Sequence, residues 1–140
     1  MNKEMAKDYL ERSLRCLEEA EMAFAKGDYA GTVRRGQEAF ELCLKALLRA
    51  MGIEYPKEHD VSDVLEAERH RLPDRLLGAL EEMKALSREL ASLRGPALYG
   101  YEREGIPASK AFKRDYASSV LEKVRGHVGA IRDLLAPILR

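Results

Sequence analysis

Residues 29–51 read YAGTVRRGQEAFELCLKALLRAM, and this segment decides the fold. Its large apolar residues recur at the three- and four-residue spacing of one helical face. That face comprises Val33, Phe40, Leu44, Leu47 and Met51, and is widened by Cys43 and Leu48. Gly52 and Pro56 end the predicted helix because both residues disfavour helical continuation. An apolar face of this width must pack against further helices rather than remain in water.

The preceding segment has a matching stripe and predicts a helix over about residues 3–26. The stripe consists of Leu10, Leu14, Leu17, Ala20 and Phe24. Gly27 and Asp28 form a turn between the two segments. Because the connection is so short, the two helices are expected to lie antiparallel and side by side.

The remainder of the chain repeats the helical pattern. Asp60 can cap a short helix over about residues 61–70, and Pro73 suits the first turn of a helix that runs to Arg94. The stripe of that helix is Leu77, Leu80, Met83, Leu86, Leu90 and Leu93. A last helix runs from about Ser109 or Lys113 to Leu139, loosened near Pro137. Its stripe is Tyr116, Val120, Val124, Val128 (or His127), Ile131, Leu135 and Ile138. We therefore expect an all-α, up-and-down bundle of four long helices plus one short helix, forming a single domain over residues 1–140.

Composition limits the function. The 140 residues contain 24 Lys plus Arg and 24 Asp plus Glu, so any nucleic-acid or nucleotide binding must come from a local patch. Cys16 and Cys43 lie in helical patterns and are expected to be buried thiols. No metal site and no cofactor are expected, because Cys/His clusters and phosphate-binding glycine motifs are missing from the sequence. With no signal peptide or long apolar run, we expect a cytoplasmic protein without contact to a membrane.

The strongest functional signal is the octapeptide RGPALYGY at residues 94–101. Its glycines and proline predict a loosening of the helix, where Arg94 can bind phosphate. Arg94 can instead satisfy the carbonyl groups at a helix end. Tyr99 and Tyr101 would point to the same side in extended geometry, whereas a turn at Gly100 would separate them.

Three further polar residues invite interpretation. His59 precedes Asp60, but adjacent residues rarely form a working catalytic pair, so packing of His59 on the second helix is the preferred reading. Gln37 lies on the apolar side of that helix and is expected to bond to the loop that holds His59. Gln37, Glu38 and His59 are therefore interpreted as structural polar residues.

These features together resemble the HEPN domain family. The resemblance rests on Asp28-Tyr29, Gln37-Glu38-Ala39, the segment 44–48, His59-Asp60-Val61, and Arg94 with Tyr99-Gly100. It implies a helical bundle and a homodimer. Many HEPN proteins are metal-independent ribonucleases that bear an arginine, four to six residues, and then a histidine, often followed by one residue and a tyrosine. Two such motifs meet across the dimer.

In this chain Arg94 matches the arginine and Tyr101 the trailing tyrosine, but Tyr99 occupies the histidine position. A histidine exchanges protons near pH 7, whereas a tyrosine titrates near pH 10, so the usual general base is lost. The resemblance also implies a minimal nucleotidyltransferase as partner, with Tyr101 as acceptor of AMP and Arg94 as nucleotide contact. We thus expect a dimeric module that binds nucleotide or such a partner, in a toxin–antitoxin-type or related pair. The alternatives are a metal-independent ribonuclease toxin using Arg94 with Tyr99 and Tyr101 across a dimer cleft, and a purely structural helical protein.

Overall fold

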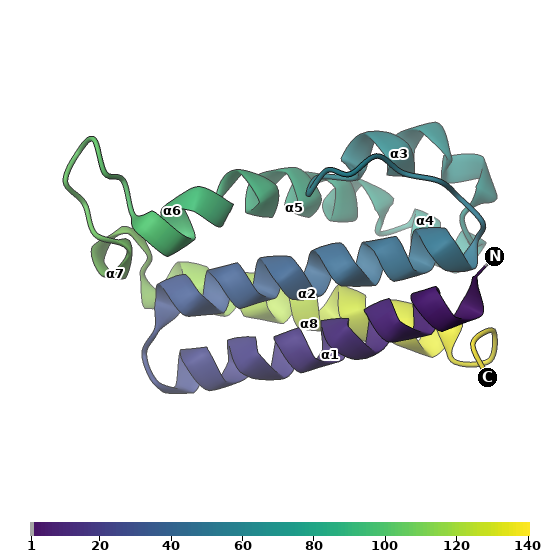
Figure 1. The fold of residues 1–140 in the computed structure, drawn as a ribbon, viewed down its shortest axis with the longest axis horizontal. Coiled ribbons are helices and arrows are strands. Elements are labelled where there is room, and N and C mark those ends of the chain that lie inside the picture. The colour runs from purple at the N-terminus through teal and green to yellow at the C-terminus, as the bar shows by residue number, and fades with distance from the viewer. Residues whose placement is uncertain (1) are drawn as a thin grey trace.

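The computed structural model describes residues 2–140, which are helical apart from loops and one isolated bridge between Tyr101 and Ile106. Three long helices dominate: α1 (Lys3–Ala25), α2 (Tyr29–Ala50) and α8 (Arg114–Leu135). The all-α fold expected from the sequence is confirmed. Both chain ends lie at the same end of the bundle (Figure 1).

Helices α1 and α2 form an antiparallel pair (Figure 1). Side chains cap both N-termini, because Asn2 accepts a hydrogen bond from the backbone of Met5 and Asp28 accepts one from Gly31. Buried Phe40, Leu44 and Leu47 project from α2 into the core, as the apolar stripe predicts.

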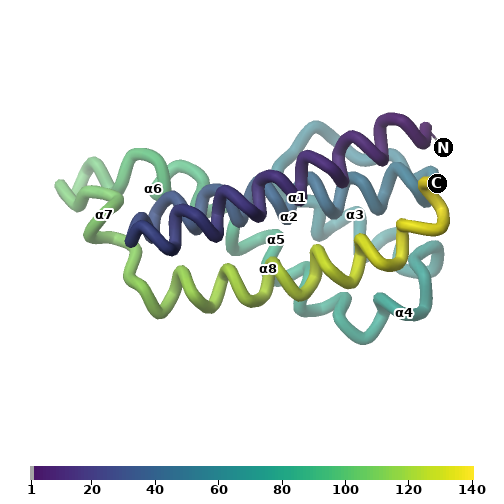
Figure 2. Tube along the Cα trace, turned by 90° about the horizontal axis from the view of Figure 1, so that it is seen from below, coloured from purple at the N-terminus to yellow at the C-terminus, as the bar shows by residue number. Residues whose placement is uncertain are grey.

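Helix α8 packs against both α2 and α1 (Figure 2). Its buried face includes Val120, Val124, Val128 and Ile131. Gly36 of α2 allows close approach, because a Cβ at this position would lie 3.3 Å from the Val120 side chain. The buried residues of the stripe predicted for this helix therefore lie on the face that packs against α1 and α2.

Shorter elements cover the side of α2 away from α1 (Figure 1). In chain order they are α3 (Ser62–Ala67), the 3₁₀-helix η1 (Arg69–Arg71), α4 (Asp74–Leu77), α5 (Leu80–Ser92), α6 (Arg94–Tyr99) and α7 (Ala108–Ala111). Of these, α5, α6 and α7 lie against α2. Helices α5 and α6 bring the C-terminal part of the octapeptide to the surface of the bundle.

The helix predicted over residues 73–94 is divided in two. Helix α4 ends at Leu77, and α5 begins at Leu80 after a turn at Gly78 and Ala79. The interruption shifts the helical register, so Leu76 is buried while Leu77, assigned to the stripe from its spacing, is 42% exposed. The last helix ends at Leu135, two residues before Pro137, and not at Leu139 as its spacing predicted.

The octapeptide is more regular than its glycines and proline suggest. Arg94 to Tyr99 form helix α6, and Pro96 lies in its first turn, where a missing backbone N–H costs no intrahelical hydrogen bond. The irregular part begins only at Gly100. Arg94 thus starts a helix instead of ending one.

Both cysteines are free thiols, with Cys43 buried and Cys16 half-buried. Burial raises the pKa of the Cys43 thiol to about 12, so this group stays protonated and unreactive. None of the helices within residues 2–140 is both long and apolar enough to cross a bilayer. The same residues contain no group of three or more His, Cys, Asp or Glu side chains placed to hold a metal ion.

Candidate functional site

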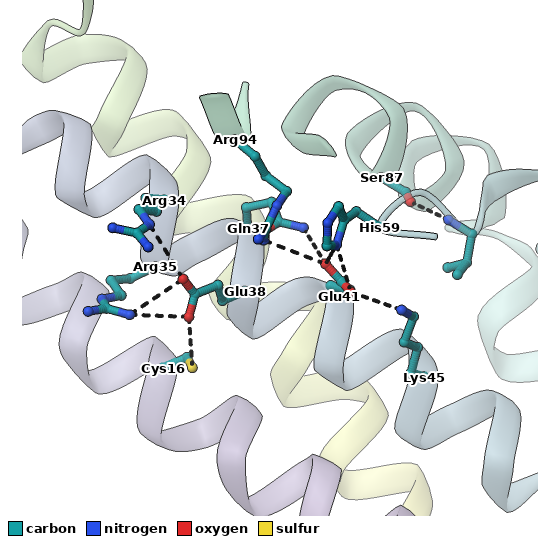
Figure 3. A network of polar contacts seen from close by, with 11 residues as sticks. Cys16, Arg34, Arg35, Gln37, Glu38, Glu41, Lys45, His59, Ser87 and Arg94 are labelled. Atoms are coloured by element: carbon teal, nitrogen blue, oxygen red, sulfur yellow. Dashed lines mark hydrogen bonds and ion pairs between the residues drawn. The ribbon is translucent and has the colours of Figure 1, made fainter. Parts of the chain in front are cut away.

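Arg94 extends from the start of α6 across to the middle of α2 (Figure 3). Its Nη1 donates a hydrogen bond of 2.5 Å to Oε1 of Gln37 and lies 3.8 Å from Oε1 of Glu41. These contacts are to side chains of another helix, so the reading of Arg94 as a cap for helix-end carbonyls does not describe them. The side chain remains 34% exposed, which leaves part of the guanidinium available to a ligand.

Gln37 connects Arg94 to a carboxylate. The amide is buried; its Oε1 accepts from Arg94, and its Nε2 donates to Oε1 of Glu41 over 2.8 Å. Gln37 does not bond to the loop that holds His59, as the sequence suggested; within residues 2–140 its amide bonds Arg94 and Glu41, and Glu41 in turn bonds His59. A buried amide with both ends bonded holds the arginine in a fixed position.

Glu41 is the centre of the network, and the sequence reading overlooked it. Besides Gln37, its carboxylate accepts from Lys45 Nζ at 2.9 Å and bonds His59 Nδ1 at 3.0 Å. Burial by itself would raise the pKa of Glu41, but the hydrogen bonds from Gln37 and Lys45 and the positive charge of Lys45 together lower it. The sequence signal for this network is the four-residue spacing of Gln37, Glu41 and Lys45, because residues four apart are neighbours on the surface of a helix.

His59 approaches Glu41 from the segment between α2 and α3. Because the carboxylate can only accept, the imidazole Nδ1 carries the proton in this contact. The side chain is 56% exposed, and within residues 2–140 its Nε2 makes no hydrogen bond. His59 touches the second helix through its hydrogen bond to Glu41, which orients the ring, but the side chain is exposed rather than packed on that helix. The adjacent Asp60 instead accepts hydrogen bonds from the backbone of Ser62 and from Ser87 Oγ.

Glu38 lies on the α1 side of the same surface. Its carboxylate pairs with Arg35 at 3.2 Å and Arg34 at 3.7 Å, and the Cys16 thiol is 3.9 Å away. Burial, followed by the nearby negative charge of Glu38, raises the pKa of Cys16. Glu38 therefore carries a largely compensated charge and connects α1 to α2, as a structural polar residue would.

Tyr99 and Tyr101 lie outside this network. Tyr99 is 64% exposed and Tyr101 39%, and neither hydroxyl hydrogen-bonds to another group within the described residues. Tyr99 ends α6, whereas the backbone of Tyr101 pairs with Ile106, so the extended geometry that would align the two side chains is not adopted. Gly100 separates them with a φ of 74°, and a Cβ there would collide with the carbonyl oxygen of Ile106.

An open groove of about 320 Å³ lies beside Arg94, Glu41 and His59. It is lined by Arg12, Glu38, Glu41, Leu42, His59 and Arg94. Glu41 and Glu38 are each offset by at least one cation, while Arg94 and the Nε2 edge of His59 remain partly free. This arrangement offers an anion the partly exposed Arg94 side chain and places the imidazole of His59 in the same groove.

The comparisons with known proteins agree with this architecture. Searches of curated proteins and of solved structures gave no match. The model of the HEPN domain family matches residues 6–134, a range that begins in α1 and ends in the last turn of α8. The match includes every residue of the groove described above. The chain therefore belongs to the HEPN domain family.

Proposed function

We propose that the chain is a dimeric HEPN module that binds a nucleotide, or a small nucleotidyltransferase partner, in a toxin–antitoxin-type or related pair. The observation that carries this proposal is Arg94, whose guanidinium is held by Gln37 and whose side chain remains 34% exposed in an open groove. A positioned arginine with free N–H groups suits the phosphate of a nucleotide.

The replacement of the motif histidine supports a binding role. Tyr99 is 64% exposed, and its hydroxyl makes no hydrogen bond within residues 2–140. A phenol lacks the ready proton exchange of an imidazole near pH 7, so it is a poor base for activating a ribose hydroxyl. Binding at Arg94 does not require that step.

Nucleotide binding is tested by calorimetric titration of the purified protein with ADP. We expect Arg94→Ala to abolish measurable binding, and Arg75→Ala, which removes an arginine from α4, to leave it unchanged. Equal ADP affinity of the wild type and Arg94→Ala would remove the proposed role of Arg94.

The partner half of the proposal concerns Tyr101. In adenylylation, the phenolic oxygen attacks the α-phosphorus of ATP, pyrophosphate leaves, and the phenolic proton passes to solvent. Tyr101 is 39% exposed and lies on a projecting segment that another protein can reach (Figure 1). Mass spectrometry after co-expression with a minimal nucleotidyltransferase should show added AMP that Tyr101→Phe removes and Tyr99→Phe retains. AMP found on both variants alike would place the modification elsewhere.

One observation favours a second candidate, the metal-independent ribonuclease. His59 lies in the Arg94 groove, with Nδ1 oriented by Glu41 and Nε2 free among residues 2–140. The His59 imidazole, oriented by Glu41, can take a proton from a ribose 2′-hydroxyl in place of the missing motif histidine. Arg94 then balances the phosphate charge. RNA cleavage by the wild type that is lost in both His59→Gln and Arg94→Ala supports this candidate. Cleavage that survives either substitution removes it.

A further inference from the structure

A histidine between α5 and α8 has a ring nitrogen without a hydrogen-bond partner. The side chain of His127 is 11% exposed, its ring centre lies 5.7 Å from that of Phe40, and its Nε2 atom is buried. Glu82 Oε1 lies 3.3 Å from Nε2, but the two groups are not aligned for a hydrogen bond, so Nε2 has no such partner within residues 2–140. A buried polar atom without a partner is destabilising, and a bound ligand can supply the missing group.

An open cavity of about 340 Å³ lies at this histidine. It is lined by Glu82, Ser119, Glu122, Lys123, Gly126 and His127. The Glu82 side chain is 56% exposed, so its carboxylate can turn outward and uncover His127 Nε2. The cavity shares no lining residue with the Arg94 groove. It is therefore a separate place on the molecule.

The charges at the cavity favour a cation. The carboxylates of Glu82 and Glu122 line it together with one ammonium group, that of Lys123, so the lining is negative overall while the imidazole is neutral. A neutral imidazole whose Nδ1 carries the proton accepts a hydrogen bond at Nε2, just as the carboxylates accept. A cation with several N–H groups can therefore donate to the histidine and to both carboxylates.

The cavity suits an alkyl amine better than a metal ion. In the part of the chain that the structure describes, no three His, Cys, Asp or Glu side chains are placed to hold a metal. Nothing lies within 4 Å of the position that a Cβ would take at Gly126, which leaves open space along α8 for methylene groups. Glycine inside a helix is destabilising relative to alanine, and no contact among residues 2–140 requires a glycine at this position.

Another carboxylate lies farther along the same two helices. Glu89 of α5 accepts a hydrogen bond from the Tyr116 hydroxyl of α8, so the two helices face each other at Glu89 as they do at Glu82. The seven residues from Glu82 to Glu89 correspond to two helical turns, about 10 Å along the axis, and this spacing places both on one side of α5. Two carboxylates so arranged suit a chain with an amine at each end.

We propose that the α5–α8 groove binds a linear polyamine. One ammonium group donates to His127 Nε2 and to the carboxylates of Glu82 and Glu122. The methylene chain passes over Gly126, and a second ammonium group reaches Glu89. The proposal goes beyond the role of Arg94 and does not depend on it, because none of these groups contacts Arg94.

Calorimetric titration of the purified protein with spermidine, at about pH 8 where an ordinary imidazole is neutral, tests the site. Glu82→Gln, Glu122→Gln and His127→Phe should each weaken binding about fivefold or more, because each removes an acceptor for the ammonium group. Gly126→Met keeps every charge but fills the open space, so it should abolish measurable binding. Thermal unfolding establishes that each variant is folded; should His127→Phe be unfolded, Gly126→Met decides.

The matched control is Glu11→Gln, which removes an exposed carboxylate of α1. Its affinity for spermidine should equal that of the wild type. Putrescine and n-butylamine serve as shorter probes, and both are expected to bind more weakly than spermidine because neither reaches both carboxylates. Magnesium chloride at the same concentration should not displace spermidine.

Four results overturn the proposal. A wild type that does not bind spermidine lacks the site, and binding that survives both Gly126→Met and His127→Phe reflects diffuse attraction to acidic side chains elsewhere. Equal affinity for n-butylamine and spermidine removes the part assigned to Glu89. In ¹⁵N NMR spectra the His127 Nε2 signal should shift on addition of spermidine; a ring that is protonated at both nitrogens and unaffected by spermidine identifies the contact with Glu82 as an internal ion pair.

Discussion

The carboxylate of Glu41 shows how one side chain can organise a surface. It is only 14% exposed, yet Gln37, Lys45 and His59 all bond to it and Arg94 lies nearby. A carboxylate with so many donors stays ionised, since each hydrogen bond favours the charged form. If Glu41 lost its charge, Arg94 and His59 would lose the carboxylate that both side chains approach.

We predict that Glu41→Gln lowers the free energy of unfolding by about 1–3 kcal/mol at neutral pH. The substituted amide presents N–H groups to neighbours that are themselves donors. Because folding lowers the pKa of Glu41, its ionisation stabilises the protein above the unfolded pKa of about 4.3, and this contribution is lost as the pH falls through the folded pKa. Urea denaturation at about pH 7 and about pH 3 should show the difference between wild type and variant shrinking in acid.

The control for this prediction is Glu122→Gln, since Glu122 is exposed on α8. Its effect should stay within about 0.5 kcal/mol at either pH. A Glu41→Gln protein as stable as wild type at neutral pH would mean that the network contributes nothing to folding.

Among the elements, α6 lies between the end of one helix and an irregular turn. It starts directly after α5, carries Arg94 at one end and Tyr99 at the other, and stops at Gly100. The φ of 74° at Gly100 turns the chain toward the Tyr101–Ile106 bridge. This turn keeps Tyr99 and Tyr101 apart and away from the Arg94 network.

We predict that Gly100→Ala destabilises the protein by about 1–3 kcal/mol, because the new Cβ meets the backbone of Ile106 to Ala108 and a positive φ is strained for alanine. Gly95→Ala in the same helix is the matched control. Nothing lies within 4 Å of a Cβ there, so its stability should be unchanged or slightly increased. Thermal unfolding of the two variants side by side makes the comparison, and equal melting temperatures would refute it.

The sequence predicted the long elements well, and the reason is visible in α2. Its stripe is long and uninterrupted, so burial and helical spacing agree at Val33, Phe40 and Leu44. Prediction was weaker where glycine and proline occur, since Gly95 and Pro96 are compatible with the first turn of a helix as well as with a loop. Arg94 was identified, but the Glu41–His59 contact joins residues 18 positions apart through a loop whose path no local pattern gives.

At the scale of the whole molecule, exposed apolar side chains are unevenly distributed. Four of the six large ones within residues 2–140 are Leu98, Tyr99, Tyr101 and Ile106, on the α6–α7 projection seen at one end of the bundle (Figure 1). The other two, Met22 and Leu77, lie apart from that segment in the chain. A concentration of this kind is typical of a surface that another molecule covers. The dimer proposed above is therefore expected to bury Leu98 and Ile106 of this projection and to leave Tyr101 accessible.

We predict that the wild type is a dimer and that Leu98→Glu, combined with Ile106→Lys, makes it monomeric, because a dimer interface would have to bury both new charges. Sedimentation equilibrium measures the mass directly. Leu77→Glu is the matched control, since Leu77 is as exposed as Leu98 but lies on α4, and this variant should remain a dimer. A monomeric wild type would contradict the dimer itself, whereas a double variant that still dimerises would place the interface elsewhere. Testing the monomeric variant for ADP binding then shows whether the proposed role of Arg94 depends on the dimer, since the contacts that hold Arg94 to Gln37 and Glu41 lie within one chain.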